Sequence, residues 1–289
     1  MYPQSDANCP FFLNLTVSHK FDYTRLYSVS NQMFEARFAN ATLLKRILDA
    51  IKDLVQDVNL LCTEDGIELQ SMDAAHVALI NFTILADACS LYTCDTQVTL
   101  GINVINLTKI IKCAEAEDSV VLSLSQDESS LNITFESRSG SRKHEFAMNL
   151  MNIDSQHLSI PETEYSCSIK MPSAEFSRFI RDGATFGETV TLSVKEDVLV
   201  ATIRGDAGIT TITEKQDKTS AKPSQWTEIE CGAPVSMMFA LKYLAAFTKA
   251  QSISDQVSLY LVAGSPLYVS YDMEAKGSVG FYLAPKHDE

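Results

Sequence analysis

One unit, a strand that leads into a short helix and then into further strands, recurs four times and constrains the fold more than any other feature of the chain. The four helices are expected to begin near residues 41, 104, 173 and 239. The resulting period of about 60–70 residues is longer than that of the common solenoid repeats. The helical segments follow a 3.6-residue period, whereas the strands alternate apolar and polar residues. The sequence therefore predicts an α+β protein of two similar halves, each built from two similar units.

The boundaries of the halves follow from breaks in these patterns. Residues 1–32 are rich in Ser, Asn, Tyr and Gln and have no sustained periodicity, so we interpret them as a flexible N-terminal extension. Residues 150–166 contain Pro161 and several acidic residues, and we interpret them as an extended connector. The two predicted domains then span residues 33–149 and 167–289.

Each of the four helices is predicted to have one apolar face and one basic face. In the first helix, Leu44, Ile47 and Leu48 mark the apolar side when residues are placed about 100° apart. Basic residues recur on the opposite side, and the other three helices repeat this segregation. The basic positions are Lys45, Arg46, Lys52, Lys109, Lys112, Arg178, Arg181, Lys242 and Lys249.

The helices differ in charge from the rest of the chain. They hold nine basic and four acidic residues, a local net charge of +5, whereas the 289 residues together carry −14. One basic helix face is usually only a solvated surface, but four of them in an acidic chain indicate a shared surface that meets a polyanion. Lys and Arg that contact phosphates without reading bases bind double-stranded DNA irrespective of its sequence.

Seven motifs connect the chain to a known family. They are LQSMDAAHV (69–77), LTKIIKCA (107–114), LMNID (150–154), IPETEYSC (160–167), KMPSAEFSRFIRD (170–182), FALKYLAAFTKA (239–250) and FYLAPK (281–286). With them the chain resembles eukaryotic proliferating cell nuclear antigen over residues 33–288. The resemblance implies the DNA clamp fold in a homotrimeric ring, with helices lining the hole and sheets outside. It implies a DNA sliding clamp and polymerase processivity factor that acts in the nucleus, in replication and repair, without catalytic activity, metal or cofactor.

The resemblance also implies a hydrophobic pocket beneath the connector, in which short motifs of partner proteins bind as a helical plug. The expected partners are DNA polymerases, the clamp loader, flap endonuclease, DNA ligase and mismatch-repair proteins. Without the motif context, His76 would be interpreted as a structural residue and Tyr282 as a core aromatic. By matching motifs, the pocket residues are Met72, His76, Leu158, Ile160, Pro161, Tyr165, Pro266, Tyr282, Ala284 and Pro285.

Subunits of this family join through edge strands, which satisfies backbone groups that would otherwise invite aggregation. Here the edge strands are expected at about residues 142–149 and 209–215. Phe146 stands where the family commonly has Tyr. The expected interface residues are Arg142, Phe146, Ile209 and Ile212.

The chain departs from the family at three places. Thr93 and Thr96 flank a Cys-Asp pair at which relatives usually carry basic residues, so some phosphate contacts are expected to be lost. The lysine that carries ubiquitin in many relatives aligns with either Lys195 or Glu196. The extension before Met33 has no family counterpart.

Three other functions are weighed against the clamp. An enzyme would need a motif such as GxxxxGK[ST], GxGxxG, HExxH or GxSxG, none of which occurs, and the five His and seven Cys have no triad or zinc spacing. A subunit of the heterotrimeric checkpoint clamp would share the fold, but the motifs favour the replicative clamp. An acidic interaction scaffold would leave the basic helix faces unexplained. No apolar run approaches the roughly 20 residues that cross a bilayer, so no membrane partner is expected.

Overall fold

Both halves of the chain contain the same order of elements. The computed structural model describes residues 32–125, 129–154 and 163–286, all of which fall in one unit, Gln32–Glu289. Each half consists of one strand, a helix, five strands, a second helix and three strands. The predicted repeat and the α+β class are therefore confirmed. The expected extension, residues 1–32, lies outside the described residues except for Gln32, which begins the first strand.

The bounds of the first half are as follows. Its elements are β1 (Gln32–Phe38), α1 (Thr42–Ile51), β2 (Asp57–Thr63), β3 (Gly66–Met72), β4 (Ala78–Leu85), η2 (Ala86–Ala88), β5 (Leu91–Cys94), β6 (Val98–Asn103), α2 (Val104–Lys112), β7 (Ser119–Ser125), β8 (Ser130–Glu136) and β9 (Lys143–Asn149).

The second half repeats this order, with three further 3-10 helices. Its elements are β10 (Cys167–Pro172), α3 (Ser173–Ala184), β11 (Thr189–Lys195), β12 (Val198–Gly205), β13 (Gly208–Lys215), η3 (Pro223–Gln225), β14 (Glu228–Cys231), β15 (Val235–Ala240), α4 (Leu241–Phe247), η4 (Thr248–Ser252), β16 (Gln256–Leu261), β17 (Leu267–Asp272), η5 (Glu274–Lys276) and β18 (Gly277–Leu283).

The helices begin within about two residues of their expected positions, and a side chain caps the first turn of two of them. The Asn40 side chain accepts the Thr42 N–H at 3.0 Å at the start of α1, and Asn103 accepts the Asn106 N–H at 3.0 Å in α2. The fourth helical segment, within the motif at residues 239–250, is not one continuous α-helix. Its α-helical part ends at Phe247, and the chain continues as the tighter 3-10 helix η4.

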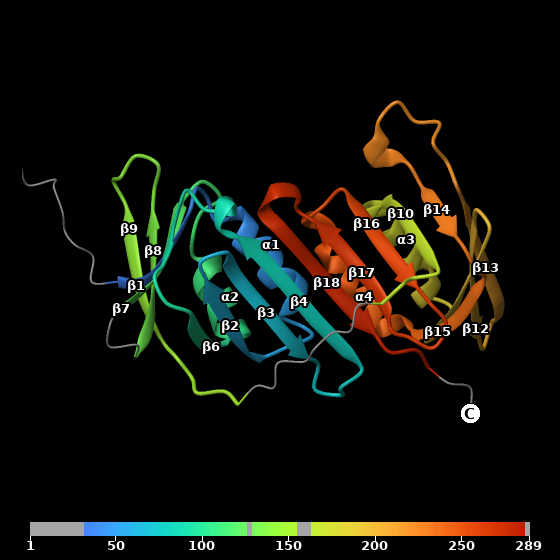
Figure 1. Cartoon of the computed structure of the whole chain (residues 1–289), viewed down its shortest axis with the longest axis horizontal. Coiled ribbons are helices and arrows are strands. Elements are labelled where there is room, and N and C mark those ends of the chain that lie inside the picture. The colour runs from blue at the N-terminus through green and yellow to red at the C-terminus, as the bar shows by residue number, and fades with distance from the viewer. Residues whose placement is uncertain (1–31, 126–128, 155–162, 287–289) are drawn as a thin grey trace, which may run out of the picture. The chain divides into compact units, whose positions relative to one another are not determined.

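One sheet joins the two halves. It has nine strands in the order β14-β10-β16-β17-β18-β4-β3-β2-β6, and β4 and β18 pair antiparallel at its centre, with Ala78 opposite Leu283 and Gly277 opposite Ile84. A five-stranded sheet, β5-β1-β7-β8-β9, completes the first half, and a four-stranded sheet, β13-β12-β11-β15, completes the second (Figure 1). The four helices lie on the same side of the nine-stranded sheet.

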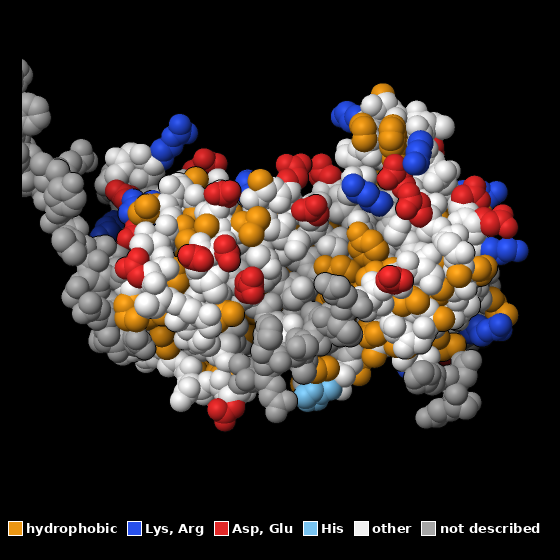
Figure 2. Space-filling view, viewed as in Figure 1, with side chains coloured by type: hydrophobic (Ala, Val, Ile, Leu, Met, Phe, Trp, Pro, Cys, Tyr) orange, Lys and Arg blue, Asp and Glu red, His pale blue; other side chains and the backbone are white. Residues whose placement is uncertain are grey.

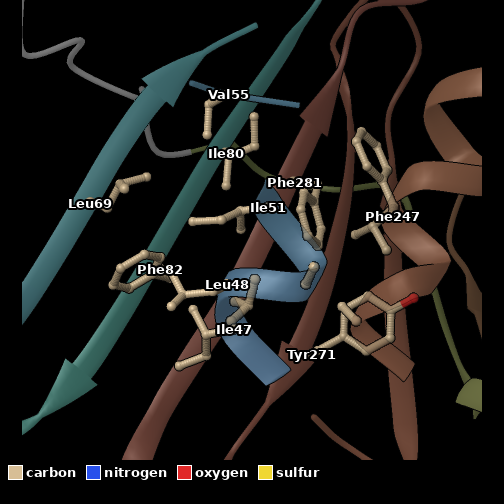
Figure 3. Packing of buried hydrophobic residues seen from close by; sticks show 14 of the residues in the cluster. Ile47, Leu48, Ile51, Val55, Leu69, Ile80, Phe82, Phe247, Tyr271 and Phe281 are labelled. Atoms are coloured by element: carbon tan, nitrogen blue, oxygen red, sulfur yellow. The ribbon is translucent and has the colours of Figure 1, made fainter. Parts of the chain in front are cut away.

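The hydrophobic core lies between this sheet and the helices and is continuous across the halves. Figure 3 shows side chains of α1 packed against those of β3 and β4, and Phe247 of α4 beside Phe281 of β18. The rings of Phe247 and Phe281 stack with their centroids 4.6 Å apart, and Tyr271 meets Phe281 edge to face at 6.3 Å. Such aromatic pairs stabilise a core beyond the area they bury. The halves are therefore held together by side chains as well as by the β4–β18 ladder.

The helices follow one another in a row. α1 contacts α2 on one side and α4 with η4 on the other, and α4 and η4 in turn contact α3, which gives the order α2-α1-α4-α3. The row places all four predicted basic faces along one layer of the molecule. Within the described part of the chain, no helix is both long and apolar enough to cross a membrane.

Candidate nucleic-acid interface and peptide-binding pocket

The basic side chains of the helical row lie on the side opposite the core. In α1 the buried residues are Leu44, Ile47, Leu48, Ala50 and Ile51. Lys45 and Lys52 are half-buried, and Arg46 is exposed. The exposed positions of the other helices include Lys109, Lys112, Arg178, Arg181, Lys242 and Lys249. The fold therefore brings together the nine residues that the sequence predicts as one surface, which we call the basic row.

Five members of the basic row pair with carboxylates of the same layer. Lys52 lies 2.5 Å and Lys112 3.7 Å from Asp49, so one carboxylate serves both α1 and α2. Partial burial raises the pKa of Asp49, but its hydrogen bond to Lys52 and the charges of Lys52 and Lys112 outweigh burial, and the pKa is lowered. The remaining pairs are Lys249 with Asp53, Arg178 with Glu175, and Arg181 with Asp182 at 3.6 Å.

The other four basic side chains have different surroundings. Lys45 donates to the Ala114 carbonyl at 2.6 Å, and the Lys242 ammonium lies 4.9 Å from the centre of the Tyr243 ring. Arg46, Lys109 and Lys242 form no ion pair with any described carboxylate. Exposed ion pairs contribute only about 0–1 kcal/mol, so a phosphate can replace the carboxylate partner at small cost. The basic row therefore combines three unpaired cations with five that can exchange partners.

Strand pairing in the nine-stranded sheet places several residues of the predicted peptide pocket next to one another. Leu79 of β4 is opposite Met72 of β3 on one side and Tyr282 of β18 on the other. Tyr282 is opposite Tyr268 of β17, which is opposite Tyr260 of β16. Because directly opposed residues point to the same face, these side chains form one line across five strands.

Four tyrosines gather on this line. The Tyr268 ring stacks on Tyr282 at 4.4 Å and on Tyr260 at 5.6 Å, and Tyr165 lies 5.4 Å from Tyr260, measured between ring centres. All four are half-buried. Burial and the neighbouring phenols raise the pKa of Tyr165 and of Tyr282, so both stay neutral at physiological pH. We call Tyr165, Tyr260, Tyr268 and Tyr282 the tyrosine cluster.

Two members of the cluster, Tyr260 and Tyr268, were not predicted as pocket residues. A glycine makes room for one of them, since a Cβ on Gly280 would lie 2.7 Å from Cε2 of Tyr268. The sequence does contain a signal: Tyr260 stands between the buried Leu259 and Leu261, so strand alternation places its ring on the face away from the core. Figure 2 shows this face, where hydrophobic side chains gather over β16 and β17 among scattered acidic ones.

The remaining described pocket residues lie at the ends of the strands that carry the line of side chains. Pro266 is exposed just before β17, Ala284 and Pro285 are half-buried just after β18, and His76 is exposed in the turn between β3 and β4. The Ala284 N–H donates to the Val77 carbonyl at 3.0 Å, which joins the C-terminal segment to this turn. Three predicted pocket residues, Leu158, Ile160 and Pro161, lie outside the described residues.

Asp73 fixes the turn that carries His76. Its buried carboxylate accepts the Val77 and Ala78 N–H groups at 2.8 Å and the Ala75 N–H at 3.1 Å, and the Tyr243 hydroxyl of α4 donates to it at 2.9 Å. Burial alone would raise the pKa of Asp73, but these hydrogen bonds together lower it. A single carboxylate thus ties the turn of the first half to a helix of the second half. A groove of about 750 Å³ beside the turn is lined by residues that include Ala75, Val77, Tyr243, Ala284 and Pro285.

The predicted subunit edges are the last strands of their sheets. β9 ends the five-stranded sheet and β13 ends the four-stranded sheet, so each has one side without a partner strand among the described residues. Ile209 of β13 is 62% exposed, which is high for an isoleucine. The Phe146 ring packs on Phe135 at 5.5 Å while remaining half-buried.

Two other predicted interface residues have partners within the chain. Arg142 lies just before β9 and forms ion pairs with Glu115 and, at 2.9 Å, with Asp118. Ile212 is half-buried and packs against the core. Arg142 and Ile212 therefore both contribute contacts within a single chain, whether or not they also contact a second subunit. The two Thr residues that depart from the family, Thr93 and Thr96, lie in and after β5.

Comparison with known proteins identifies two adjacent matches. The family model of the proliferating cell nuclear antigen N-terminal domain matches residues 33–157, and that of the C-terminal domain matches residues 159–286. The proliferating cell nuclear antigen of Chaetomium thermophilum is 42% identical over 254 residues, which cover 88% of this chain and 98% of the relative.

Proposed function

The chain belongs to the proliferating cell nuclear antigen family and is a DNA sliding clamp and processivity factor; from this premise we propose that three copies close into a ring around duplex DNA in the nucleus. The observation that carries the proposal is the basic row in a chain whose net charge is −14. The ring works as a non-catalytic scaffold, because its contacts hold DNA and partner proteins without changing either.

The basic row supplies contacts that permit sliding. Three unpaired cations, Arg46, Lys109 and Lys242, meet phosphates first. Paired cations such as Lys52 exchange Asp49 for a phosphate as the duplex moves, and each exchange costs little because exposed ion pairs are weak. None of these contacts depends on base identity, so the grip is uniform along the DNA and weakens with salt.

The ring closes when β13 of one subunit pairs with β9 of the next. Both strands are sheet edges among the described residues, and a new ladder satisfies their backbone groups. Ile209 is then buried against the neighbouring subunit, and the exposed part of Phe146 is covered. Arg142 lies just before β9, beside this interface, and keeps its ion pair with Asp118 within its own subunit.

The tyrosine cluster and its surroundings bind the partner peptides. Met72, His76, Pro266, Ala284 and Pro285 belong to the same pocket, and the connector residues Leu158, Ile160 and Pro161 complete it. An apolar helical plug gains about 25 cal/mol for each Å² it buries there, and its aromatic residues are the hot spots. DNA polymerases, the clamp loader, flap endonuclease, DNA ligase and mismatch-repair proteins are the partners of this pocket.

Sedimentation of the chain and of Ile209→Glu tests the ring. The parent is expected to sediment at about three times the monomer mass of 31.9 kDa. Ile209→Glu is expected to sediment as a folded monomer, because the side chain is mostly exposed within one chain and a charge there opposes only the contact between subunits. A parent that stays monomeric at all concentrations would contradict the homotrimer and favour a subunit of a heterotrimeric clamp.

A further inference from the structure

Two thiols face each other where β10 begins and β14 ends. Six cysteines lie in the described residues, and among them Cys167 and Cys231 have sulfur atoms 2.7 Å apart. Both sulfurs also lie 3.2 Å from the Ala233 carbonyl oxygen, and that of Cys231 lies 3.7 Å from the Val194 carbonyl oxygen at the end of β11. The pair therefore sits where the outermost strand of the nine-stranded sheet meets β11 of the four-stranded sheet.

The backbone register suits a covalent bond between them. Cys167 and Cys231 are directly opposite in the antiparallel β10–β14 ladder. The Gly232 N–H donates to the Ser166 carbonyl at 2.8 Å, so the neighbouring cysteine pair occupies a non-hydrogen-bonded position. Cα atoms at such a position are about 4.5 Å apart, within the range of about 4.4–6.8 Å found in disulfides. A bond between the sulfurs needs no displacement of the strands.

The two thiols differ in their access to solvent. Cys167 is 1% exposed, whereas Cys231 is half-buried and lies on the outermost strand of the sheet. Burial raises the pKa of Cys167 to about 12, which keeps it a neutral thiol. Because Cys231 is the more exposed of the two thiols, it is the one that meets a small oxidant first.

We propose that Cys167 and Cys231 form a reversible disulfide when the protein meets a hydroperoxide. The Cys231 thiolate attacks hydrogen peroxide, its O–O bond breaks, and Cys231 sulfenic acid and hydroxide form. The Cys167 sulfur then attacks the sulfenic sulfur, an S–S bond replaces the S–O bond, and the oxygen leaves as water with the Cys167 proton. In sum, two thiols and one peroxide give one disulfide and two waters, and each sulfur loses one electron.

The disulfide would link β14, a short edge strand, covalently to β10. β14 has four residues and pairs only with β10 among the described strands, and the long segment 216–227 leads into it. A disulfide across the 64-residue separation restricts the unfolded chain and stops β14 from opening alone. The expected result is a melting temperature higher by on the order of 5 °C. Amide exchange in β14 is expected to slow at least tenfold.

Mass spectrometry of the full-length protein tests the site directly. The native protein is treated with hydrogen peroxide, free thiols are blocked, and the protein is digested without reduction. The expected product is a peptide pair joined through Cys167 and Cys231, about 2 Da lighter than the two free peptides and separated by dithiothreitol. Recovery of both cysteines as blocked free thiols, under conditions that oxidise the exposed Cys113, would overturn the proposal.

Two variants separate this pair from general thiol oxidation. Cys113→Ser is expected to keep the peroxide-induced rise in melting temperature, because Cys113 is exposed and outside the pair. Cys231→Ser is expected to lose it. A rise that persists in Cys231→Ser would assign the effect to other residues and would also overturn the proposal.

Discussion

The basic row and the tyrosine cluster lie on opposite sides of the same sheet, and they are built for different kinds of binding. The basic row holds mostly exposed cations, five of which already have exchangeable carboxylate partners. The tyrosine cluster holds rings that are stacked on one another before any partner arrives. Solvated ion pairs give a weak grip that any duplex satisfies, whereas preformed aromatic surface gives a site that selects its ligand. In the proposed clamp, one side of the molecule therefore serves movement along DNA and the other serves retention of a partner.

The largest effect is expected from truncating the tyrosine cluster at Tyr282, the ring that stands next to the segment with Ala284 and Pro285. Tyr282→Ala removes a ring that stacks on Tyr268 at 4.4 Å, and it should weaken binding of a client-derived peptide about thirtyfold, a loss of about 2 kcal/mol. Tyr260→Phe is the matched control, since it keeps the ring and should bind nearly normally. Calorimetric titration of both variants measures the difference. Equal affinity of Tyr282→Ala and the parent would place the pocket elsewhere.

A smaller loss is expected from reversing charge in the basic row. Lys109→Glu with Lys242→Glu should weaken DNA binding about tenfold and reduce the slope of log K against log salt by roughly 2, because each lost phosphate contact contributes about 0.9. Both side chains are exposed, so folding should be unaffected. Lys276→Glu, on the exposed helix η5 outside the basic row, is the control. A double variant with the parent's salt slope would show that this row does not face DNA.

A several-fold loss of peptide affinity is expected from Asp73→Asn. The amide leaves fewer acceptors for three N–H groups and the Tyr243 hydroxyl, so the turn that carries His76 loosens. Because the folded-state pKa of Asp73 is lowered, its stabilising contribution is present above the ordinary carboxyl pKa of about 4 and is lost as the pH falls through the folded value. The gap in melting temperature between parent and variant should therefore narrow below about pH 4. A gap that widens there would contradict this role.

The smallest effect, and the only gain, is expected from Asp49→Asn. The change releases Lys52 and Lys112 from their shared carboxylate and removes one negative charge from the basic row. DNA binding should strengthen about twofold to threefold at low salt and return to the parent value at high salt. Fluorescence anisotropy with a short duplex measures the change. Weaker binding by Asp49→Asn would mean that Asp49 positions the lysines instead of competing for them.

The sequence predicted the parts of this molecule that depend on local periodicity. The starts of α2 and α3 were predicted from apolar spacing, and Asn103 caps α2, whereas the two edge strands were predicted from the family resemblance. The shared basic surface of the four helices was also predicted, because an apolar stripe on each helix leaves its basic residues on the opposite side. The ion pair of Lys249 with Asp53 was not predictable, since it joins residues 196 positions apart.

In the pocket, too, the sequence predicted some residues, whereas others depend on contacts between distant parts of the chain. Motif resemblance indicated Tyr165 and Tyr282, but Tyr260 and Tyr268 join them only through the register of β16, β17 and β18. The role of Asp73 was missed because its fourth donor, Tyr243, lies 170 residues away. The Cys167–Cys231 contact likewise depends on strand pairing, which spacing along the sequence does not reveal.

Retention on circular and linear DNA tests the central claim, that the chain encircles duplex DNA, most directly. The protein is loaded by its clamp loader onto a nicked circular duplex, and half of the sample is then cut once with a restriction enzyme. A topologically closed ring with only weak phosphate contacts is expected to stay on the circles at high salt and to leave the linear molecules by sliding off their ends. Equal retention on circles and linear molecules would contradict encirclement and would mean that the basic row holds DNA as an ordinary binding surface.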